Sequence, residues 1–414
     1  MDITSINSYW YVIGASLIII ISYLFNLVSQ KWNIPAVLLL IALGIVIRYT
    51  TGINHIDGNS PILNILGVVG LIMIVLEAAL DLELKKEKTG LIIKSFFVAS
   101  IALSLSSYLI ALCIQFILET DLFIALVYAI PLSIMSSAII IPSISQLSEK
   151  KKEFMIYEST FSDILGIMFF YFLLSSVEYK TAGELGWNIF GNIFVTLLIS
   201  VVLSYILIYL FQKIKTKVKL FLLISVLVLL YAVGKMMHLS SLIIILFFGL
   251  IINNREIFFG KKLQKYFDTT ELANVLKDFK TITEETAFVV RTFFFVIFGL
   301  TISLSTLFKF DVFVISILFL IILYAVRYIT LRLFIGKDFE TELFIAPRGL
   351  ITVLLFFAIP KEFQNQEFES GILLFLIIAS SIIMAIALIK YDKKSKLEQP
   401  EKDYKDSTDA EIEG

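Results

Sequence analysis

Two carboxylates, Glu158 and Asp163, lie inside a single apolar run that extends from residue 154 to residue 176. An ionisable side chain at bilayer depth is energetically unfavourable, so its presence in a spanning helix indicates a functional role first. Five residues along a helix correspond to roughly 140° around its axis, so the two side chains face different neighbours. One carboxylate could then be held by a basic partner while the other faces a cavity. Two alternatives stay open: both acids are hydrogen-bonded in the interior, or Glu158 lies at the membrane interface.

The composition indicates a polytopic membrane protein. Apolar residues make up 58% of the chain and charged residues 17%, with 37 phenylalanines and a mean hydropathy of +0.92. Soluble globular proteins carry about 25% charged residues. The net charge of −1 indicates no particular partner, and we expect no nucleic-acid binding. Cys113 is the single cysteine, and both histidines lie near predicted span ends, so we expect no disulfide, metal cluster or cofactor.

Thirteen apolar segments have the length of a spanning helix, about 20 residues, or come close to it. They are residues 9–29, 33–49, 62–82, 90–118, 121–147, 154–177, 187–212, 219–236, 240–252, 287–306, 311–335, 341–359 and 369–391. The sequence therefore predicts an all-α polytopic membrane protein with a transporter domain over residues 1–391. The N-terminus lacks a basic region and a small-residue cleavage site, so we expect the first segment to be a retained span.

The basic residues of the loops alternate along the chain. One set of loops is rich in lysine and arginine, at residues 31, 85–88, 150–152, 213–219, 255–265, 337 and 390–396, whereas each loop of the other set holds at most one. Cytoplasmic loops carry the excess of Lys and Arg. The alternation predicts an N-terminus outside, a cytoplasmic C-terminus and an odd number of spans. We expect the plasma membrane, and specifically a bacterial inner membrane, as the location.

Two parts of the chain are expected not to span the membrane. Residues 253–286 are polar and basic, with apolar residues at roughly helical intervals, which predicts a cytoplasmic amphipathic helix on the inner membrane surface. An ordinary surface linker helix is the alternative. The tail, residues 392–414, is short and charged, so we expect it to be disordered and too short for a nucleotide-binding regulatory domain.

Two spans contain residues that break helices. The fifth has Pro131, Pro142 and several serines, and Pro142 frees the carbonyl of Ala138 because proline lacks a backbone donor. The twelfth is interrupted by Pro347-Arg348-Gly349. If the seventh span joins two six-span units, both interruptions fall in the fifth span of their unit, and the units have opposite orientations. Interrupted spans at matching positions of inverted repeats point to a transporter site. Simple proline kinks are the alternative.

Several motifs together resemble the sodium/proton exchangers of the monovalent cation/proton antiporter superfamily. They are the run Tyr157–Asp163, which is similar to a sixth-span pattern of Gly-Glu-Ser, two residues and Asn-Asp, the run Leu71–Glu83, the run Arg291–Leu300, and Pro347-Arg348-Gly349. The resemblance extends from about residue 9 to residue 391. It implies two inverted repeats with broken, crossing helices 5 and 12, a homodimer in a lipid membrane, and a transporter rather than an enzyme.

The chain departs from this family's pattern at two places. Ser136-Ser137-Ala138 stands where the exchanger branch usually has Thr-Asp-Pro, and it is more similar to the serine-rich crossover of the potassium/proton branch. Ser162 stands where electroneutral exchangers have Asn and the electrogenic branch has a second Asp. These departures leave the choice of ion open.

Asp163 is the predicted site of the transported ions, Na⁺ (with Li⁺ or K⁺ as alternatives) and H⁺. Burial disfavours the charged carboxylate, so a proton and a monovalent cation compete for it. Neutral oxygens would complete the coordination of Na⁺, from Ser162, Ser137 or Ser136, Ser159, crossover carbonyls and water. Only the loaded carboxylate crosses the barrier readily, which makes exchange obligatory. One titrating acid predicts about one cation per proton and electroneutral transport.

Further residues are expected to support this site. The resemblance implies that Glu158 pairs with an arginine of the eleventh span, Arg327 or Arg332, and the deeper Arg327 is preferred. Arg348 would offset the crossover carbonyls and helix ends or bond other buried carbonyls. Glu77 is either a buried, hydrogen-bonded acid or part of an ion funnel.

Two alternative functions stay open. Potassium/proton exchange on the same fold differs only in coordination number and cavity size, which the sequence leaves undecided. An ion channel or a non-transporting sensor is the alternative from another class, and flux measurements distinguish it from an exchanger.

Overall fold

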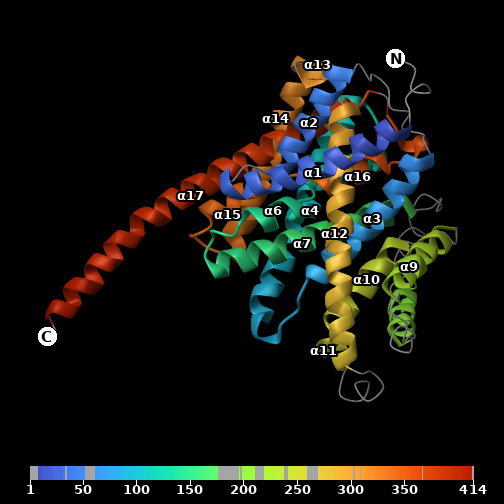
Figure 1. The fold of residues 1–414 in the computed structure, drawn as a ribbon. Coiled ribbons are helices and arrows are strands. Elements are labelled where there is room, and N and C mark those ends of the chain that lie inside the picture. The colour runs from blue at the N-terminus through green and yellow to red at the C-terminus, as the bar shows by residue number, and fades with distance from the viewer. Residues whose placement is uncertain are drawn as a thin grey trace.

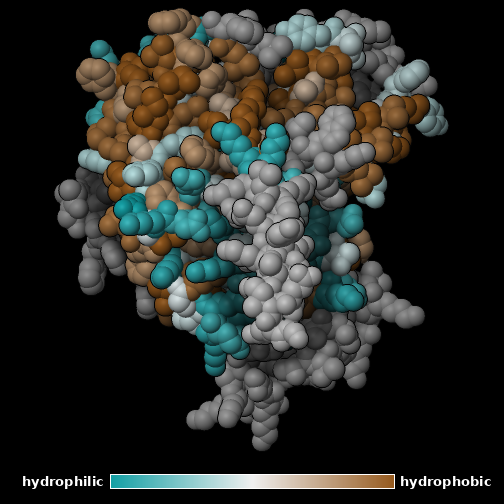
Figure 2. Space-filling view, turned by 90° about the vertical axis from the view of Figure 1, so that its left-hand side faces the viewer, coloured by the Kyte–Doolittle hydropathy of each residue, from teal (hydrophilic) through white to brown (hydrophobic). Residues whose placement is uncertain are grey.

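The structure is a computed structural model, and it describes residues 8–32, 35–51, 61–175, 195, 198–209, 219–236, 241–258, 269–301, 304–307, 309–365 and 367–412. Every regular element in these ranges is a helix. Six of the described helices are long and apolar enough to cross a membrane, and four apolar helices are shorter. Figure 2 shows hydrophobic side chains over the upper part of one face and hydrophilic ones gathered below them. The predicted all-α membrane fold is confirmed.

The helices form two series on either side of the seventh predicted span. The first comprises α1 (Ser8–Trp32), α2 (Ala36–Thr51), α3 (Pro61–Asp81), α4 (Thr89–Leu118), α5 (Leu122–Ser133), α6 (Ser137–Ser143) and α7 (Glu149–Ser175). The second comprises α9 (Lys219–Met236), α10 (Ser241–Asn253), α11 (Arg255–Phe258), α12 (Thr269–Thr301), α13 (Leu304–Leu307), α14 (Phe310–Phe334), α15 (Glu340–Phe344), α16 (Leu350–Phe357) and α17 (Ser370–Ile412). Short 3₁₀ turns lie at Lys86–Lys88 and Lys361–Phe363.

The helix contacts have the pattern that two inverted repeats require. The second helix of each series packs on the third of the other, α2 on α12 and α10 on α3. Likewise α1 contacts both α2 and α12, and its counterpart α9 contacts both α10 and α3. Two further contacts join the series, α4 with its equivalent α14, and α5 with α16, the second half of the other interrupted span. The contacts that build the first three helices of one series thus have counterparts in the other.

The same contacts divide the molecule into two groups of helices. We call α1–α3, α9, α10 and α12 the scaffold group, and α4–α7 with α14–α17 the crossover group. Within the scaffold group α2 and α12 approach closely, because a Cβ on Gly44 would lie 2.1 Å from the carbonyl oxygen of Val296. Small residues allow such approach between membrane helices. The groups meet mainly where α3 contacts α7, α12 contacts α16 and α1 contacts α6. In Figure 1, α12 stands upright beside the crossover group, and α17 leaves the body on the left.

Two interruptions of the helices cross at the centre of the crossover group. Residues 134–136 separate α5 from α6, and residues 345–349 separate α15 from α16. The backbone N–H of Ser136 donates to the carbonyl of Pro347 at 2.9 Å. A Cβ on Gly349 would lie 2.5 Å from Ser136 Oγ, so glycine permits this crossing. The first break precedes Pro142, which lies inside α6, so the freed carbonyl of Ala138 is not where the helix opens.

Three sequence boundaries differ from the described structure. Residues 269–286 are not a separate surface helix but the first half of α12, because Phe279 is fully buried and packs edge-to-face on Phe248 of α10. Helix α17 continues to Ile412, so no break in the helix marks the expected tail boundary at residue 391. The seventh predicted span lies partly outside the described residues, and Leu198–Tyr209 form an apolar helix there.

Candidate ion-binding site

Asp163 lies in the middle of α7, directly beside the first helix break. Its side chain is 1% exposed. Ser137, the first residue of α6, donates its backbone N–H to Asp163 Oδ2 at 3.0 Å and donates its hydroxyl to the same oxygen. The other oxygen, Oδ1, is buried and has no hydrogen-bond partner among the residues that the structure describes. Buried polar atoms are normally satisfied, so Oδ1 is the atom positioned to take a proton or a cation.

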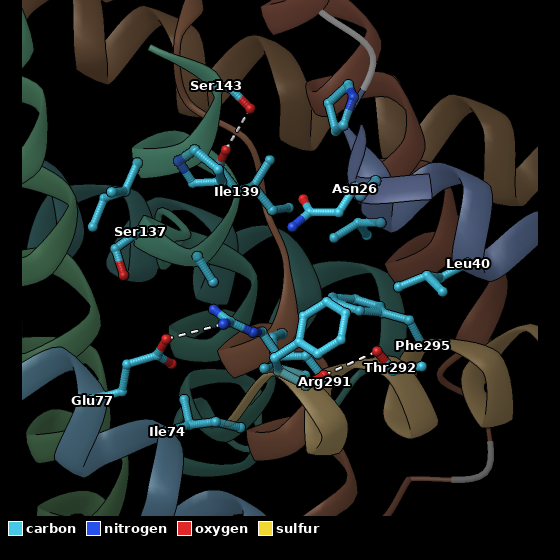
Figure 3. A pocket seen from close by; sticks show the side chains of 18 of the residues that line it. Asn26, Leu40, Ile74, Glu77, Ser137, Ile139, Ser143, Arg291, Thr292 and Phe295 are labelled. Atoms are coloured by element: carbon cyan, nitrogen blue, oxygen red, sulfur yellow. Dashed lines mark hydrogen bonds and ion pairs between the residues drawn. The ribbon is translucent and has the colours of Figure 1, made fainter. Parts of the chain in front are cut away.

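A cavity of about 390 Å³ reaches Asp163 between the two helix groups. Its walls come from α1, α2, α3 and α12 of the scaffold group and from α6, α7 and α16 of the crossover group. In Figure 3, Glu77 of α3, Arg291 of α12 and Ser137 of α6 lie around one space. The carboxylate is therefore buried within the protein but borders a space large enough for several water molecules.

An ion pair lines the cavity near Asp163. Arg291 Nη2 donates to Glu77 Oε1 at 2.9 Å, and the two side chains are 22% and 13% exposed (Figure 3). Because its charge is offset by Arg291, Glu77 is less available to a cation than Asp163 is. Glu77 therefore lies in the cavity wall and is bonded to Arg291, and whether it contributes to an ion funnel stays a prediction.

Polar side chains continue from this pair to one end of the cavity. Asp81, at the end of α3, and Glu284 of α12 both line the cavity. Lys280 lies 2.9 Å from Asp81 Oδ1 and 3.9 Å from Glu284 Oε1. Asn26 of α1 also lines the cavity (Figure 3). We call this end of the cavity, with Asp81 and Glu284, the cavity mouth. Both carboxylates are partly exposed to solvent, and negative charges at the entrance of a cleft attract cations.

Glu158 is bonded to a charged partner, whereas the hydrogen-bond donors of Asp163 are neutral. Arg327 of α14 donates Nη1 to Glu158 Oε1 at 2.5 Å and Nη2 to Oε2 at 3.0 Å, a bidentate pair. The same guanidinium donates Nη2 to the carbonyl of Glu342 at 2.7 Å. Arg332, the alternative partner, instead donates to the carbonyl of Gly336 near the end of α14. The pair joins α7, α14 and α15. This geometry supports the predicted structural role of the pair, which stays a prediction.

Arg348 binds the carbonyl end of the opposite half-helix. Its side chain is buried and donates to the carbonyls of Leu132 at 3.2 Å and Ser133 at 3.4 Å, the last residues of α5, and to that of Ala346. Carbonyls at a helix C-terminus carry partial negative charge, which a cation stabilises. The backbone N–H of Arg348 donates to Ser380 Oγ of α17 at 3.0 Å. These contacts support the first expected role of Arg348, in which it offsets the carbonyls of the crossover and of a helix end.

Comparisons with known proteins agree with this geometry. A model of the family described as "Sodium/hydrogen exchanger, transmembrane" matches residues 16–390. The chain belongs to the sodium/hydrogen exchanger family. No curated protein matches the sequence.

Two solved structures of a sodium proton antiporter have the fold of this exchanger. Both are of MjNhaP1 from Methanocaldococcus jannaschii. The structure at pH 8 has a TM-score of 0.67 and 20% identity, and the match covers 92% of this chain and 99% of that one. A 3D EM map gives a TM-score of 0.65 at 19% identity, covering 95% of this chain and 97% of that one. The expected membership of the exchanger family is confirmed, and the fold likeness extends over nearly the whole chain.

The serines predicted around Asp163 fall in different places. Ser137 lies in the cavity wall and binds the carboxylate. Ser136 is buried at the crossing, and its hydroxyl has no partner. Ser162 accepts the N–H of Met135 at 2.9 Å and so stabilises the open backbone. Ser159 donates to the carbonyl of Met155 in its own helix and is not among the residues of the cavity wall. Of these four serines, Ser137 alone has a hydrogen bond to Asp163.

Sequence reasoning did not identify the partners on α12. Arg291 was noted only as part of a motif, although an arginine inside an apolar run is itself a signal of function. The pairing of Arg291 with Glu77 joins residues 214 positions apart, which no local pattern predicts. Lys280 and Glu284 were placed in a surface segment because helix α12 was expected to begin at residue 287, and so the mouth of the cavity was missed.

Proposed function

We propose that this exchanger transports Na⁺ against H⁺ by alternating access, with Asp163 as the single site that both ions occupy. The observation that carries the proposal is a buried carboxylate with one unpartnered oxygen at the end of a cavity. Ser137 occupies Oδ2 with two donors, which leaves Oδ1 for either ion. Na⁺ is a hard cation, so the carboxylate, the Ser137 hydroxyl oxygen, crossover carbonyls and cavity water are suitable ligands.

The direction in which the cavity opens follows from the predicted orientation. The mouth contains the end of α3, and the residue before α2, Pro35, also lines the cavity. Both adjoin loops that contain lysine. The positive-inside rule places these loops in the cytoplasm. This conformation is then open to the cytoplasm, with the N-terminus outside and the C-terminus inside. Labelling of a cysteine at Asp403, with Cys113 replaced, tests the orientation, since reaction with an impermeant reagent from outside would contradict it.

Alternating access would use the seam between the two helix groups. The groups share few helix contacts, and the cavity lies along them. A movement of the crossover group against the scaffold group would carry Asp163 from one side of the membrane to the other. An empty, charged Asp163 resists this movement because a buried unpaired charge is strongly unfavourable. A bound proton or Na⁺ neutralises it, and this requirement couples the two fluxes.

The stoichiometry follows from the number of free acids. Of the acids near the site, Glu158 is paired with Arg327 and Glu77 with Arg291, while Asp81 and Glu284 share Lys280 at the exposed mouth. Among the described residues of the cavity wall, Asp163 is left as the buried acid without a basic partner to exchange one proton for one cation, so transport should be electroneutral. Potassium/proton exchange stays the alternative substrate choice because Ser136-Ser137-Ala138 is similar to the crossover of that branch.

A bacterial inner membrane and a homodimer complete the proposal. Helix α1 has large apolar side chains on its outer surface, including Trp10 at 66% exposure and Tyr23 at 60%. Such a face suits lipid or a second copy of the chain. Crosslinking in native membranes would distinguish these, because a monomer at all crosslinker concentrations contradicts the dimer.

The decisive experiment is cation-driven proton movement in proteoliposomes. We expect an imposed Na⁺ gradient to move protons in the wild type, and Asp163→Asn to abolish this while the protein remains folded. Asp121→Asn is the matched control, because Asp121 is an exposed carboxylate at the start of α5. Parallel gradients of Li⁺, K⁺ and Rb⁺ rank the substrates.

Two results would refute the proposal. Wild-type rates in Asp163→Asn would remove Asp163 from the mechanism. A Na⁺ flux that needs no proton movement would indicate a channel. A clear dependence of the rate on a clamped membrane potential would instead mean that a second group titrates. That result would contradict electroneutral transport but not the role of Asp163.

A further inference from the structure

A second cavity, distinct from the ion cavity, lies between the α3–α4 connection, the end of α10 and the first half of α12. Its volume is about 620 Å³. Five basic side chains line it, namely Lys85, Lys86, Arg255, Lys277 and Lys280, against two acidic ones, Glu83 and Glu87. We call it the basic pocket. Its lining carries three more positive than negative charges, and the mechanism proposed above uses none of the residues that are unique to it.

Three of the cations are free to bind a ligand. Lys85 is paired with Glu83 at 2.9 Å, and Lys280 with Asp81 at 2.9 Å. Among the described residues, Lys86, Arg255 and Lys277 have no carboxylate within ion-pair distance. Unpaired cations around one cavity form a site for an anion, and the planar guanidinium of Arg255 suits the oxygens of phosphate in particular.

The walls of the basic pocket are held in place by hydrogen bonds. Asn254 Oδ1 accepts the N–H of Leu84 at 2.5 Å, and Asn254 Nδ2 donates to the carbonyl of Leu82 at 2.8 Å. These bonds fix the α3–α4 connection against the end of α10. Three apolar side chains, Leu84, Ile257 and Leu276, share the lining with the charges. A charged pocket with apolar neighbours matches a phosphate group at a membrane surface.

We infer that the basic pocket binds a phosphate-bearing anion, either the headgroup of an anionic lipid or a soluble phosphate, and that its occupancy acts on the mouth of the ion cavity through Lys280. Lys280 lines the basic pocket, while its partners Asp81 and Glu284 line the ion cavity. An anion in the pocket competes for the Lys280 ammonium. The two carboxylates at the mouth then lose part of their compensation and attract cations more strongly.

Binding is tested directly on the purified, full-length protein, without any need for transport. In native mass spectrometry with equal amounts of phosphatidylglycerol and phosphatidylcholine, we expect the wild type to retain phosphatidylglycerol preferentially. Lys86→Gln/Lys277→Gln removes two unpaired charges and should weaken retention about 25-fold, at about fivefold per lysine. Lys337→Gln/Lys390→Gln is the matched control, since both lysines are exposed and lie in the crossover group, and it should behave as the wild type.

A second arm of the experiment distinguishes the sources of the anion. Inorganic pyrophosphate is titrated into delipidated protein by calorimetry. Saturable binding that needs Lys86 and Lys277, without a preference for phosphatidylglycerol, identifies a soluble ligand. Binding of neither probe overturns the proposal, and so does an equal loss in the two double variants, because the effect would then be one of total charge.

The coupling to the ion cavity has its own readout, and this part rests on the proposed exchange function. In vesicles of phosphatidylcholine mixed with phosphatidylglycerol, the wild type should show a two- to fivefold lower apparent KM for Na⁺ than in phosphatidylcholine alone, as expected for partly screened charges. Lys86→Gln/Lys277→Gln should lose this difference and keep its maximal rate. An unchanged KM in the wild type, with binding demonstrated, would overturn the coupling through Lys280. Absence of exchange in every sample would refute the proposed function and leave the binding result intact.

Discussion

Glu158 and Asp163 lie on the same helix, carry the same acidic group and are each 1% exposed, yet their surroundings are opposite. Glu158 accepts two bonds from a guanidinium, which offsets its charge fully. In the described part of the chain, Asp163 accepts hydrogen bonds only from the neutral N–H and hydroxyl of Ser137. Its second oxygen has no partner there, and the residue borders a cavity. Burial alone therefore does not distinguish a structural acid from an exchanging one. The charge of the partner and the access to water distinguish them.

From this comparison we expect the two acids to tolerate different changes. A buried pair that loses one member leaves an uncompensated charge in a medium that solvates it poorly. A carboxylate that must exist both loaded and empty cannot have a fixed cation beside it, because the cation would exclude Na⁺. Three buried or half-buried arginines near the site, Arg327, Arg291 and Arg348, are bonded to Glu158, to Glu77 and to the crossover carbonyls rather than to Asp163.

The largest expected effect on stability comes from Glu158. Glu158→Gln leaves the Arg327 guanidinium buried without its counter-charge and should lower the stability of the fold by roughly 3–5 kcal/mol. Asp163→Asn removes a carboxylate that has no counter-charge, so it should leave stability unchanged or raise it. Thermal unfolding of both variants in the same detergent measures the contrast.

Two further outcomes sharpen the contrast. Replacing both members, in Glu158→Gln/Arg327→Met, should recover part of the lost stability because no buried charge is left unpaired. If instead Asp163→Asn destabilises the protein as much as Glu158→Gln does, the division between a structural and an exchanging acid is wrong.

The fold could be predicted well from the sequence because it depends on local features, and the two acids stand out in the sequence for the same reason. Span positions follow from runs of apolar residues, and an acid or a proline inside such a run is visible without knowledge of its neighbours. The repeat could be predicted because the two interrupted spans stand at matching places. The choice of Arg327 over Arg332 rested on depth within the span, and the structure brings Arg327 to Glu158.

Contacts between distant helices could not be predicted in the same way. Ser159 lies near Asp163 on the same helix, and Ser137 lies in the interrupted fifth span. Both were candidate ligands, and the direction of each side chain distinguishes them. Ser159 faces its own helix backbone, whereas Ser137 faces the carboxylate. The first half of α12 was misassigned because it is amphipathic, and an amphipathic helix can pack on protein as well as on lipid. The burial of Phe279 shows that this helix packs on protein. That burial depends on contacts with a distant helix, which the sequence does not reveal.

The next largest effect concerns the hydroxyl of Ser137. Ser137→Ala removes a hydrogen bond to a charged group, which corresponds to roughly tenfold or more in affinity. We expect the apparent KM for Na⁺ at constant pH to rise by about that factor, with a smaller change in the maximal rate. Ser159→Ala should stay close to the wild type. A loss in Ser159→Ala equal to that in Ser137→Ala would mean that Ser159 turns toward the ion in another conformation.

The pH dependence distinguishes a shared site from separate ones. If proton and Na⁺ compete for Asp163, acidification must raise the apparent KM for Na⁺, because protonated Asp163 cannot bind the cation. In the acidic range the rise should approach about tenfold per pH unit, while the maximal rate at saturating Na⁺ stays constant. Rates at several Na⁺ concentrations and equal pH on both sides of the membrane measure this. A maximal rate that falls with acidification at a constant KM would contradict competition.

The smallest expected effects come from the ion pair in the cavity wall, and they have opposite signs. Glu77→Gln leaves the positive charge of Arg291 facing the cavity and should raise the apparent KM for Na⁺ roughly two- to fivefold through water-screened repulsion. Arg291→Gln leaves Glu77 negative and should lower the KM by a similar factor. The double variant should return toward the wild type, since the two charges are 2.9 Å apart and cancel at the distance of Asp163. Shifts of the same sign in both single variants would mean that the pair acts through the packing of α3 and α12 rather than through its charge.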